Sequence, residues 1–174
     1  MKAHRALILR SNRFLGSTLI DQGLIAVGDL EAANEIFMTT MQSDSAPRAS
    51  ILTALLHELK VLDEKVLIQN IVDNCDLGLI DLDFIKPSSL RPMNLDLDLC
   101  WATSTVPFDQ TEGIYMVATC YYLSAPVIKY WEEILGGRVI WYATTTASIS
   151  RSLERIQEIH EAEDLAAVEA EAEA

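Results

Sequence analysis

The sequence predicts an α+β protein. A helical repeat of two helical pairs comes first, and a small three-stranded α/β subdomain with helices on one face follows it. Three observations predict this class. Apolar residues recur at helical spacing through residues 11–76. Part of that stretch nearly repeats itself. Strand-forming and helix-forming runs then alternate in the order strand, strand, helix, strand, helix.

The two copies of the repeat are residues 15–35 (LGSTLIDQGLIAVGDLEAANE) and residues 51–70 (ILTALLHELKVLDEKVLIQN). Their apolar positions align with one offset of 36 residues throughout. Such a repeat predicts one supersecondary unit used twice. The copies differ at two glycines, which leucines replace in the second copy. The aligned positions are Leu15 with Ile51, Gly16 with Leu52, Leu19 with Leu55, Ile20 with Leu56, Gly23 with Leu59, Ile25 with Val61, Leu30 with Val66 and Ala33 with Gln69.

Four helices are expected in the helical repeat subdomain, residues 11–76. Residues 42–49 (QSDSAPRA) are polar and contain a proline, so they predict a loop between the two pairs. The helix boundaries follow from capping residues and glycines. They are Ser11 or Asn12 at the start of the first helix, Gly23 at its end, Gly28 and Asp29 at the start of the second, Ser50 before the third and Asp63 before the fourth.

Residues 77–103 are expected to form a linker and a short helix, although the alternation in LDLDL leaves a strand open for residues 94–101. Residues 104–160 form the small α/β subdomain, and residues 161–174 an acidic tail that frays after a turn or two. The expected elements are strands over 104–108 and 114–120 joined by the turn DQTEG, a helix from Ala125 or Pro126 to Gly136, a strand over 138–142, and a helix from Thr146 or Ser148 to Ile159.

The chain carries a net charge of −13, of which residues 154–174 hold −7. The tail is either a solubilising end or a docking segment for a basic partner. There is no basic stripe for binding nucleic acid. No apolar run approaches the roughly 18 residues of a membrane helix. Residues 6–9 are too short a run for a signal peptide, so a cytoplasmic protein is expected, at most peripheral to the inner membrane through a partner.

Catalysis has little support in the sequence. There is no GxxxxGK[ST] phosphate loop, and the three histidines are scattered without metal-ligand spacing. Neighbouring acids at Asp81, Asp83, Asp96 and Asp98 are interpreted as linker and capping residues rather than an acid–base or metal cluster. The three cysteines are far apart and predict buried free thiols in a reducing compartment. We therefore expect no enzyme, no metal and no cofactor.

The first repeat copy, LGSTLIDQGLI followed by DLEAAN, resembles the N-terminal domain of the assembly ATPases of type II secretion and type IV pili. In that family a motif of the form R-L-G-x-x-L-[LIV]-x-x-G-[LIV]-[LIV], then L-x-x-A-L-x-x-Q, occurs twice. The later segments DLDFIKP, IYMVATC, APVIKYWEEILGG, RVIWYAT and SISRSLERI resemble the second half of the same domain in order and spacing, so the resemblance covers residues 13–159.

The resemblance implies a function. In that family the domain docks the motor to a membrane partner, and it also occurs attached to membrane glycosyltransferases. The expected function is a non-enzymatic regulatory or docking module for the secretion or pilus machinery or for an envelope-polysaccharide glycosyltransferase. In a subset of the family both motif copies wrap cyclic di-GMP with arginine, backbone groups beside the glycines and apolar side chains. The alternative function is therefore a cyclic di-GMP receptor that uses the first repeat.

The family's motif is only partly present. Phe14 stands where the family has arginine, Arg13 lies one residue earlier, and Ser50 holds that place in the second copy. Two alternatives therefore stay open for Gly16 and Gly23: they serve a ligand, or they serve only helix packing and a C-cap. The candidate ligand residues are Arg10, Arg13, Phe14, Leu15, Gly16, Leu19, Gly23, Leu24 and Arg48. Tyr121 and Tyr122 are either a partner-binding aromatic pair or core residues.

Overall fold

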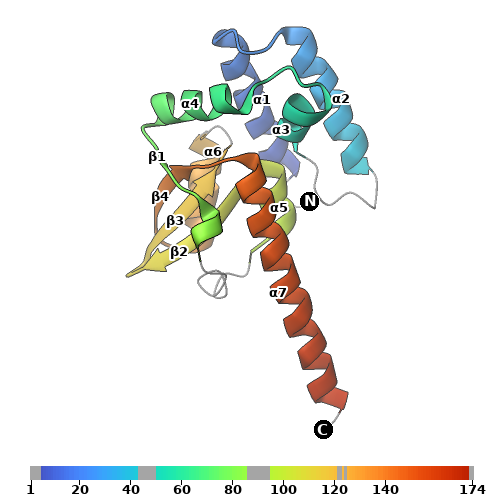
Figure 1. The fold of residues 1–174 in the computed structure, drawn as a ribbon, viewed down its shortest axis with the longest axis vertical. Coiled ribbons are helices and arrows are strands. Elements are labelled where there is room, and N and C mark those ends of the chain that lie inside the picture. The colour runs from blue at the N-terminus through green and yellow to red at the C-terminus, as the bar shows by residue number, and fades with distance from the viewer. Residues whose placement is uncertain (1–4, 43–49, 86–94, 121–122, 124, 173–174) are drawn as a thin grey trace.

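A computed structural model describes residues 5–42, 50–85, 95–120, 123 and 125–172. Figure 1 shows the N-terminal helices at one end, the sheet with its helices below them, and the last helix leading away from both. The helical half contains α1 (Arg5–Asp21), α2 (Val27–Gln42), α3 (Ile51–Thr53), which continues into the π-helical turn η2 (Ala54–Glu58), and α4 (Glu64–Cys75).

The second half is built on four strands. Its elements are β1 (Gly78–Leu79), the 3₁₀ turn η3 (Leu82–Phe84), α5 (Leu97–Thr103), β2 (Thr105–Thr111), β3 (Ile114–Thr119), α6 (Ala125–Leu135), β4 (Arg138–Ala143) and α7 (Thr146–Ala172). The α+β class is therefore confirmed, and the segment that sequence left open between helix and strand is the helix α5.

The predicted capping residues of the third and fourth helices are confirmed. The Ser50 hydroxyl accepts a hydrogen bond from the backbone N–H of Leu52 at 3.2 Å. The Asp63 carboxylate accepts from the N–H groups of Lys65 and Val66 at 2.8 and 3.2 Å. These bonds satisfy N–H groups that the first turn of a helix leaves without an intrahelical partner.

The start of the first helix was predicted wrongly. The α1 helix begins at Arg5, so Ser11 and Asn12 are not caps but buried residues in its middle, 0% and 2% exposed. They lie on the same face as Ile8 and Leu15, which the core covers. Of the loop predicted over residues 42–49, Gln42 is the last residue of α2, and residues 43–49 lie outside the described residues.

The sheet has four strands rather than the predicted three, in the order β1-β4-β3-β2. The missed strand, β1, pairs in parallel with β4, with Gly78 opposite Tyr142 and Leu79 opposite Ala143. It lies in the segment expected to be linker, because a strand of two residues gives no alternation to detect. β3 also runs parallel to β4, and β2 runs antiparallel to β3.

The turn between β2 and β3 is narrower than predicted. It consists of Glu112 and Gly113, both with positive φ (51° and 79°), which is the geometry of a two-residue type I′ hairpin. The end of α6 was predicted correctly, since Gly136 follows it with a φ of 66°. α6 packs against β4 and α7 against β2.

The last helix is longer than predicted. It runs to Ala172, so the acidic segment expected to fray continues the helix. Alanine and glutamate are strong helix formers, which explains the continuation without tertiary contacts. In Figure 1 this part of α7 projects beyond the rest of the protein.

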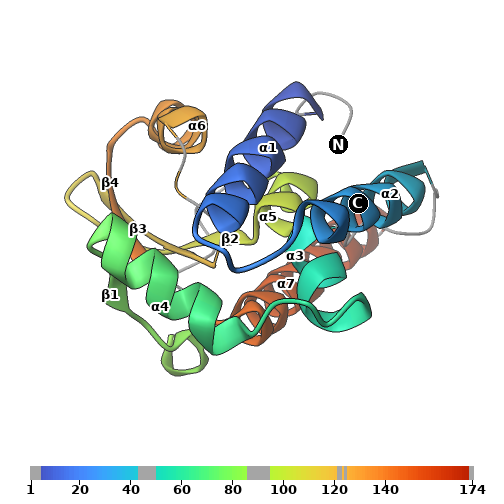
Figure 2. The same ribbon diagram turned by 90° about the horizontal axis from the view of Figure 1, so that it is seen from above.

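One continuous apolar core joins the two halves, from Ile8 in α1 to Ile156 in α7. Figure 2 shows the helices of the repeat packed directly against the α/β half. Two hydrogen-bonded contacts add to the core: the hydroxyls of Ser50 and Ser104 lie 3.2 Å apart, and Glu64 accepts from Thr146. Among the described helices, none has the length and apolarity needed to cross a membrane.

Candidate functional site

The candidate ligand residues of the first repeat fall on opposite sides of α1. The helix spacing turns Leu15, Gly16 and Leu19 toward the core, where they are buried. Arg10, Arg13 and Phe14 are exposed on the other side. The two groups therefore do not line one common groove on α1, as the cyclic di-GMP alternative requires.

Gly16 provides close helix packing. A Cβ atom added to it would lie 2.5 Å from a terminal methyl of Leu30, which belongs to α2. The space that glycine leaves open on α1 is thus already filled by the neighbouring helix of the same repeat. This geometry favours packing over ligand binding at Gly16.

Gly23 ends α1. Its φ of 70° is the left-handed conformation, its N–H bonds to the carbonyl of Ile20 at 2.8 Å, and the N–H of Leu24 bonds to the carbonyl of Leu19 at 2.9 Å. These bonds close the helix as a C-cap does. Leu24 packs against the core, so core packing accounts for this residue as well.

The second copy is not offset by 36 residues throughout, and this prediction was wrong. The π-helical turn η2 inserts one extra residue, so the left-handed position is Lys60, with φ 55°, and the N–H of Val61 bonds to the carbonyl of Leu55. The offset is 36 before the turn and 37 after it. Lys60, not Leu59, is the counterpart of Gly23, and the buried Leu67 is the counterpart of Leu30.

Leu52 keeps the predicted correspondence with Gly16, because it precedes the π-helical turn. It is fully buried, so the second copy places a leucine side chain in the core where the first copy has a glycine. Three other candidates, Arg48, Tyr121 and Tyr122, lie outside the described residues, so the structure does not place them.

Two of the neighbouring acids, Asp81 and Asp96, act as caps, as predicted. The Asp81 carboxylate accepts from the N–H of Asp83 at 3.0 Å and begins η3, and that of Asp96 accepts from the N–H of Leu99 at 3.1 Å and begins α5. Within the described part of the chain, no group of three histidine, cysteine or acidic side chains could hold a metal ion.

The segment after β1 presents an aromatic side chain that sequence reasoning did not single out. Phe84, at the end of η3, is 86% exposed, whereas Leu82 of the same turn is 2% exposed. Leu79 of β1 is 67% exposed. We call Leu79 and Phe84 the apolar edge. The sequence signal for it is the motif DLDF. In this motif Asp81 caps the turn, Asp83 pairs with Arg151 of α7, and Phe84 follows directly.

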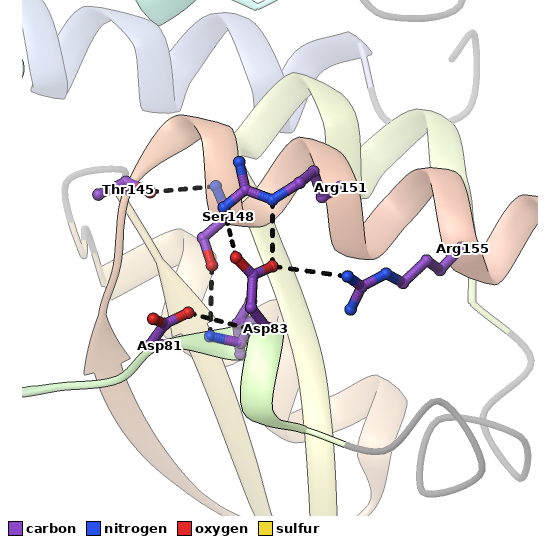
Figure 3. Close-up of polar contacts among 7 residues, drawn as sticks. Asp81, Asp83, Thr145, Ser148, Arg151 and Arg155 are labelled. Carbon is purple, nitrogen blue, oxygen red and sulfur yellow. Dashed lines mark hydrogen bonds and ion pairs between the residues drawn. The ribbon is translucent and has the colours of Figure 1, made fainter.

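Salt bridges and hydrogen bonds fix the turn that holds Phe84 (Figure 3). Asp83 receives two hydrogen bonds from the Arg151 guanidinium of α7, at 2.7 and 3.1 Å, and Arg155 lies 3.7 Å from it. The Ser148 hydroxyl accepts from the N–H of Leu82 at 3.3 Å. The hydrogen bond from Arg151 holds the pKa of the Asp83 carboxyl below its usual value, with the charges of Arg151 and Arg155 adding to the effect.

The cysteines are free thiols of two kinds. Cys100 and Cys120 are buried as predicted, and burial raises the pKa of both thiols, that of Cys120 to about 12. Cys75, at the end of α4, is only partly buried. Burial also raises its pKa, although the backbone of Leu123 opposes the rise.

Sequence comparison finds no matching protein family and no matching curated protein. Structure comparison does find similar structures. The N-terminal domain of XpsE, in crystal form I4122, matches with a TM-score of 0.52 at 15% identity, over 82% of this chain and 94% of that one. This chain has the fold of that domain. A second crystal form of the XpsE domain gives 0.51 at 14% identity, over 83% and 95% of the two chains. A structure of MshE with cdg gives 0.46 at 15% identity, over 82% and 97%.

The XpsE match extends over both halves of the chain, so the structural resemblance expected from the repeat and the segments after it is confirmed. At this level of identity the match concerns the fold. It says nothing about which residues of this chain bind a ligand or a partner.

Proposed function

We propose that this chain is a non-enzymatic docking module that binds a membrane-associated protein of a secretion or pilus machinery, or an envelope-polysaccharide glycosyltransferase. The observation that carries the proposal is the apolar edge, where an almost fully exposed aromatic side chain sits on a turn that is fixed in place. The XpsE fold supports it, since the family that the sequence resembles uses this domain for docking.

An exposed phenylalanine is costly to keep in water, and aromatic side chains dominate the binding energy of protein interfaces. Phe84 does not pack into the core although the buried Leu82 lies two residues before it. The exposed Leu79 lies on β1, which connects to the same turn. These two side chains offer an apolar contact for a partner.

The contacts that hold the turn matter as much as the exposure of Phe84. The bonds from Arg151 to Asp83 and from Leu82 to Ser148 tie two adjacent residues of η3 to α7 (Figure 3). A side chain on a fixed turn loses little conformational entropy when it binds, which raises affinity. The arrangement is thus suited to a preformed protein–protein contact.

The cyclic di-GMP alternative has less support. It requires Gly16 to leave room for a ligand, but Leu30 fills that room, and it requires Arg13 and Gly16 to face one groove, but the first is exposed and the second buried. We therefore place docking first and treat nucleotide binding as a prediction to be tested.

The test is co-sedimentation of the full chain with inner-membrane vesicles from the source organism. We expect wild-type chain to bind, Phe84→Ala to bind about tenfold more weakly, and vesicles stripped of protein by protease to bind none. Phe14→Ala is the matched control, because Phe14 is an exposed aromatic on α1, away from η3. Equal binding by Phe84→Ala would place the contact elsewhere, and equal binding to stripped vesicles would replace a protein partner with lipid.

A further inference from the structure

A groove of about 650 Å³ runs between α1 and α6, which lie next to each other in Figure 2. One wall comes from α1 and the other from α6. Residues that line it include Ala6, Leu7 and Arg10 of α1 and Pro126, Lys129 and Tyr130 of α6. We call it the α1–α6 groove.

The α1 wall is basic in an otherwise acidic protein. Arg5, Arg10 and Arg13 are all exposed, and no acidic residue occurs from Arg5 to Ile20. The α6 wall adds Lys129, which pairs with Glu133 at 3.6 Å and so contributes little net charge. Of these arginines Arg10 lines the groove, so its guanidinium supplies the net positive charge there.

The floor of the groove is apolar, and one turn beyond it the Arg10 guanidinium lies 5.9 Å from the ring centre of Phe14, itself 41% exposed. Apolar surface beside a guanidinium group suits an amphipathic helix with acidic flanks, because such a helix fills a groove between two helices and pairs an acid with the guanidinium.

The chain itself carries such a helix. From Glu161 onward, every residue of α7 whose side chain is described is exposed, and Leu165 is 65% exposed. Glu158, Glu161 and Leu165 share one face at helical spacing, and this face points away from the side on which Leu153 and Ile156 are buried. It combines an apolar centre with acidic neighbours.

The end of α7 lies far from the groove of its own molecule. Figure 1 shows α7 leading away from α1 and α6, with the C-terminus at the opposite end from α1. We propose that the end of α7 of a second copy of this chain occupies the α1–α6 groove, with its glutamates against Arg10 and Leu165 on the apolar floor. Charge complementarity between the two segments selects this occupant.

The test is sedimentation velocity of the full chain over a range of concentrations, at about 50 mM and about 500 mM salt, because salt at the higher concentration screens charge pairs. We expect association at low salt that weakens at high salt. Arg10→Glu and Glu161→Lys should each weaken it about tenfold, and the double variant Arg10→Glu/Glu161→Lys should restore it, because the swapped charges attract again. Lys65→Glu on α4 is the control for an equal change of net charge and should associate as wild type does.

Three results would overturn the proposal. A monomer at every concentration would show that copies do not meet. Association of Arg10→Glu and Glu161→Lys that is as strong as that of wild type would place the contact on another surface. Weakening by both single variants without recovery in the double variant would show that Arg10 and Glu161 do not face each other. A monomer that instead binds phosphatidylserine vesicles through Arg10 would assign the basic wall of α1 to a lipid surface.

Discussion

Glu64, in the first turn of α4, accepts hydrogen bonds from both the backbone N–H and the hydroxyl of Thr146, the first residue of α7, with the N–H at 2.7 Å. The two residues are 82 positions apart in the chain. One side chain of the helical repeat therefore caps the last helix of the α/β half. Together with the contact between Ser50 and Ser104, it ties the two halves into one unit rather than leaving them to move on a hinge.

Replacing Glu64 with alanine should destabilise the whole protein. Loss of the cap leaves the N–H of Thr146 without this partner, which costs about 1–2 kcal/mol in the free energy of unfolding. Urea unfolding measures it. Trp101, Trp131 and Trp141 report on the second half by fluorescence, and circular dichroism reports on all helices. Both signals should shift together, since one core spans the two halves.

Glu64→Gln keeps an oxygen that can accept both hydrogen bonds and is the matched control. It should lose less than half of the stability that Glu64→Ala loses. If Glu64→Ala unfolds at the wild-type urea concentration, or if the tryptophan and helix signals separate, the two halves are not coupled through this contact.

Lys60→Gly should stabilise the protein. Lys60 holds the left-handed conformation that Gly23 holds in the first repeat, and a side chain there costs about 1 kcal/mol relative to glycine. The reciprocal variant, Gly23→Ala, should destabilise by a similar amount, because nothing crowds its Cβ and only the backbone resists. A loss of stability in Lys60→Gly would contradict the assignment of Lys60 as the counterpart of Gly23.

Local signals predicted much of the fold, whereas features set by distant contacts were missed. Ser50, Asp63 and Gly23 mark helix boundaries by their own chemistry, so sequence was sufficient for them. β1 exists because Gly78 pairs with Tyr142, 64 positions later, and no local pattern announces it. The π-helical turn has no sequence signature either, so the repeat was aligned with one offset.

The candidate site was predicted less well than the fold, for a related reason. The motif identifies Gly16 but cannot show which atoms lie against it, and here they belong to Leu30 of the neighbouring helix. Phe84 was not predicted as a site residue because its turn is held by contacts between distant positions, such as Asp83 with Arg151, 68 residues later. The sequence specifies which residue types are present. Whether they bind a ligand or pack within the fold depends on tertiary contacts.

Titration of the full chain with cyclic di-GMP should release no heat at micromolar concentrations. Gly16 has no free space beside it, and the fully buried Leu52 occupies the matching place in the second copy. Isothermal titration calorimetry, with GTP and ATP as controls, measures this. Selective binding that Arg13→Ala abolishes without loss of fold would instead support the receptor function.

The contact between Asp83 and Arg151 should make stability depend on pH. Hydrogen bonding from Arg151 lowers the pKa of Asp83 in the folded protein, so the contact contributes above the unfolded-state pKa of about 3.9 and is lost as the pH falls through the lower folded-state pKa. Asp83→Asn should therefore lower the melting temperature at pH 7, and the difference from wild type should shrink below about pH 4.

Asp73→Asn is the control for this pH dependence, because the Asp73 carboxylate accepts from the amide of Gln69 rather than from a guanidinium. Its difference from wild type should stay much smaller at pH 7. High salt should reduce the effect of Asp83→Asn, since the pair is exposed and therefore screened. An effect of Asp83→Asn that stays constant from pH 7 to pH 3 would show that the charge of Asp83 does not matter.

Thiol labelling should separate the three cysteines. Cys100 and Cys120 are fully buried with raised pKa values, so they should react only when the protein unfolds. Cys75 is partly accessible and should react in the folded protein, but slowly at pH 7, because its raised pKa leaves little of the reactive thiolate. Its rate should rise about tenfold per pH unit and keep rising above pH 9, where a free cysteine with a pKa of about 8.5 levels off. Counting thiols with Ellman's reagent, with Cys75→Ser as the control, should give one in buffer and three in urea; three fast thiols in buffer would contradict the buried placement of Cys100 and Cys120.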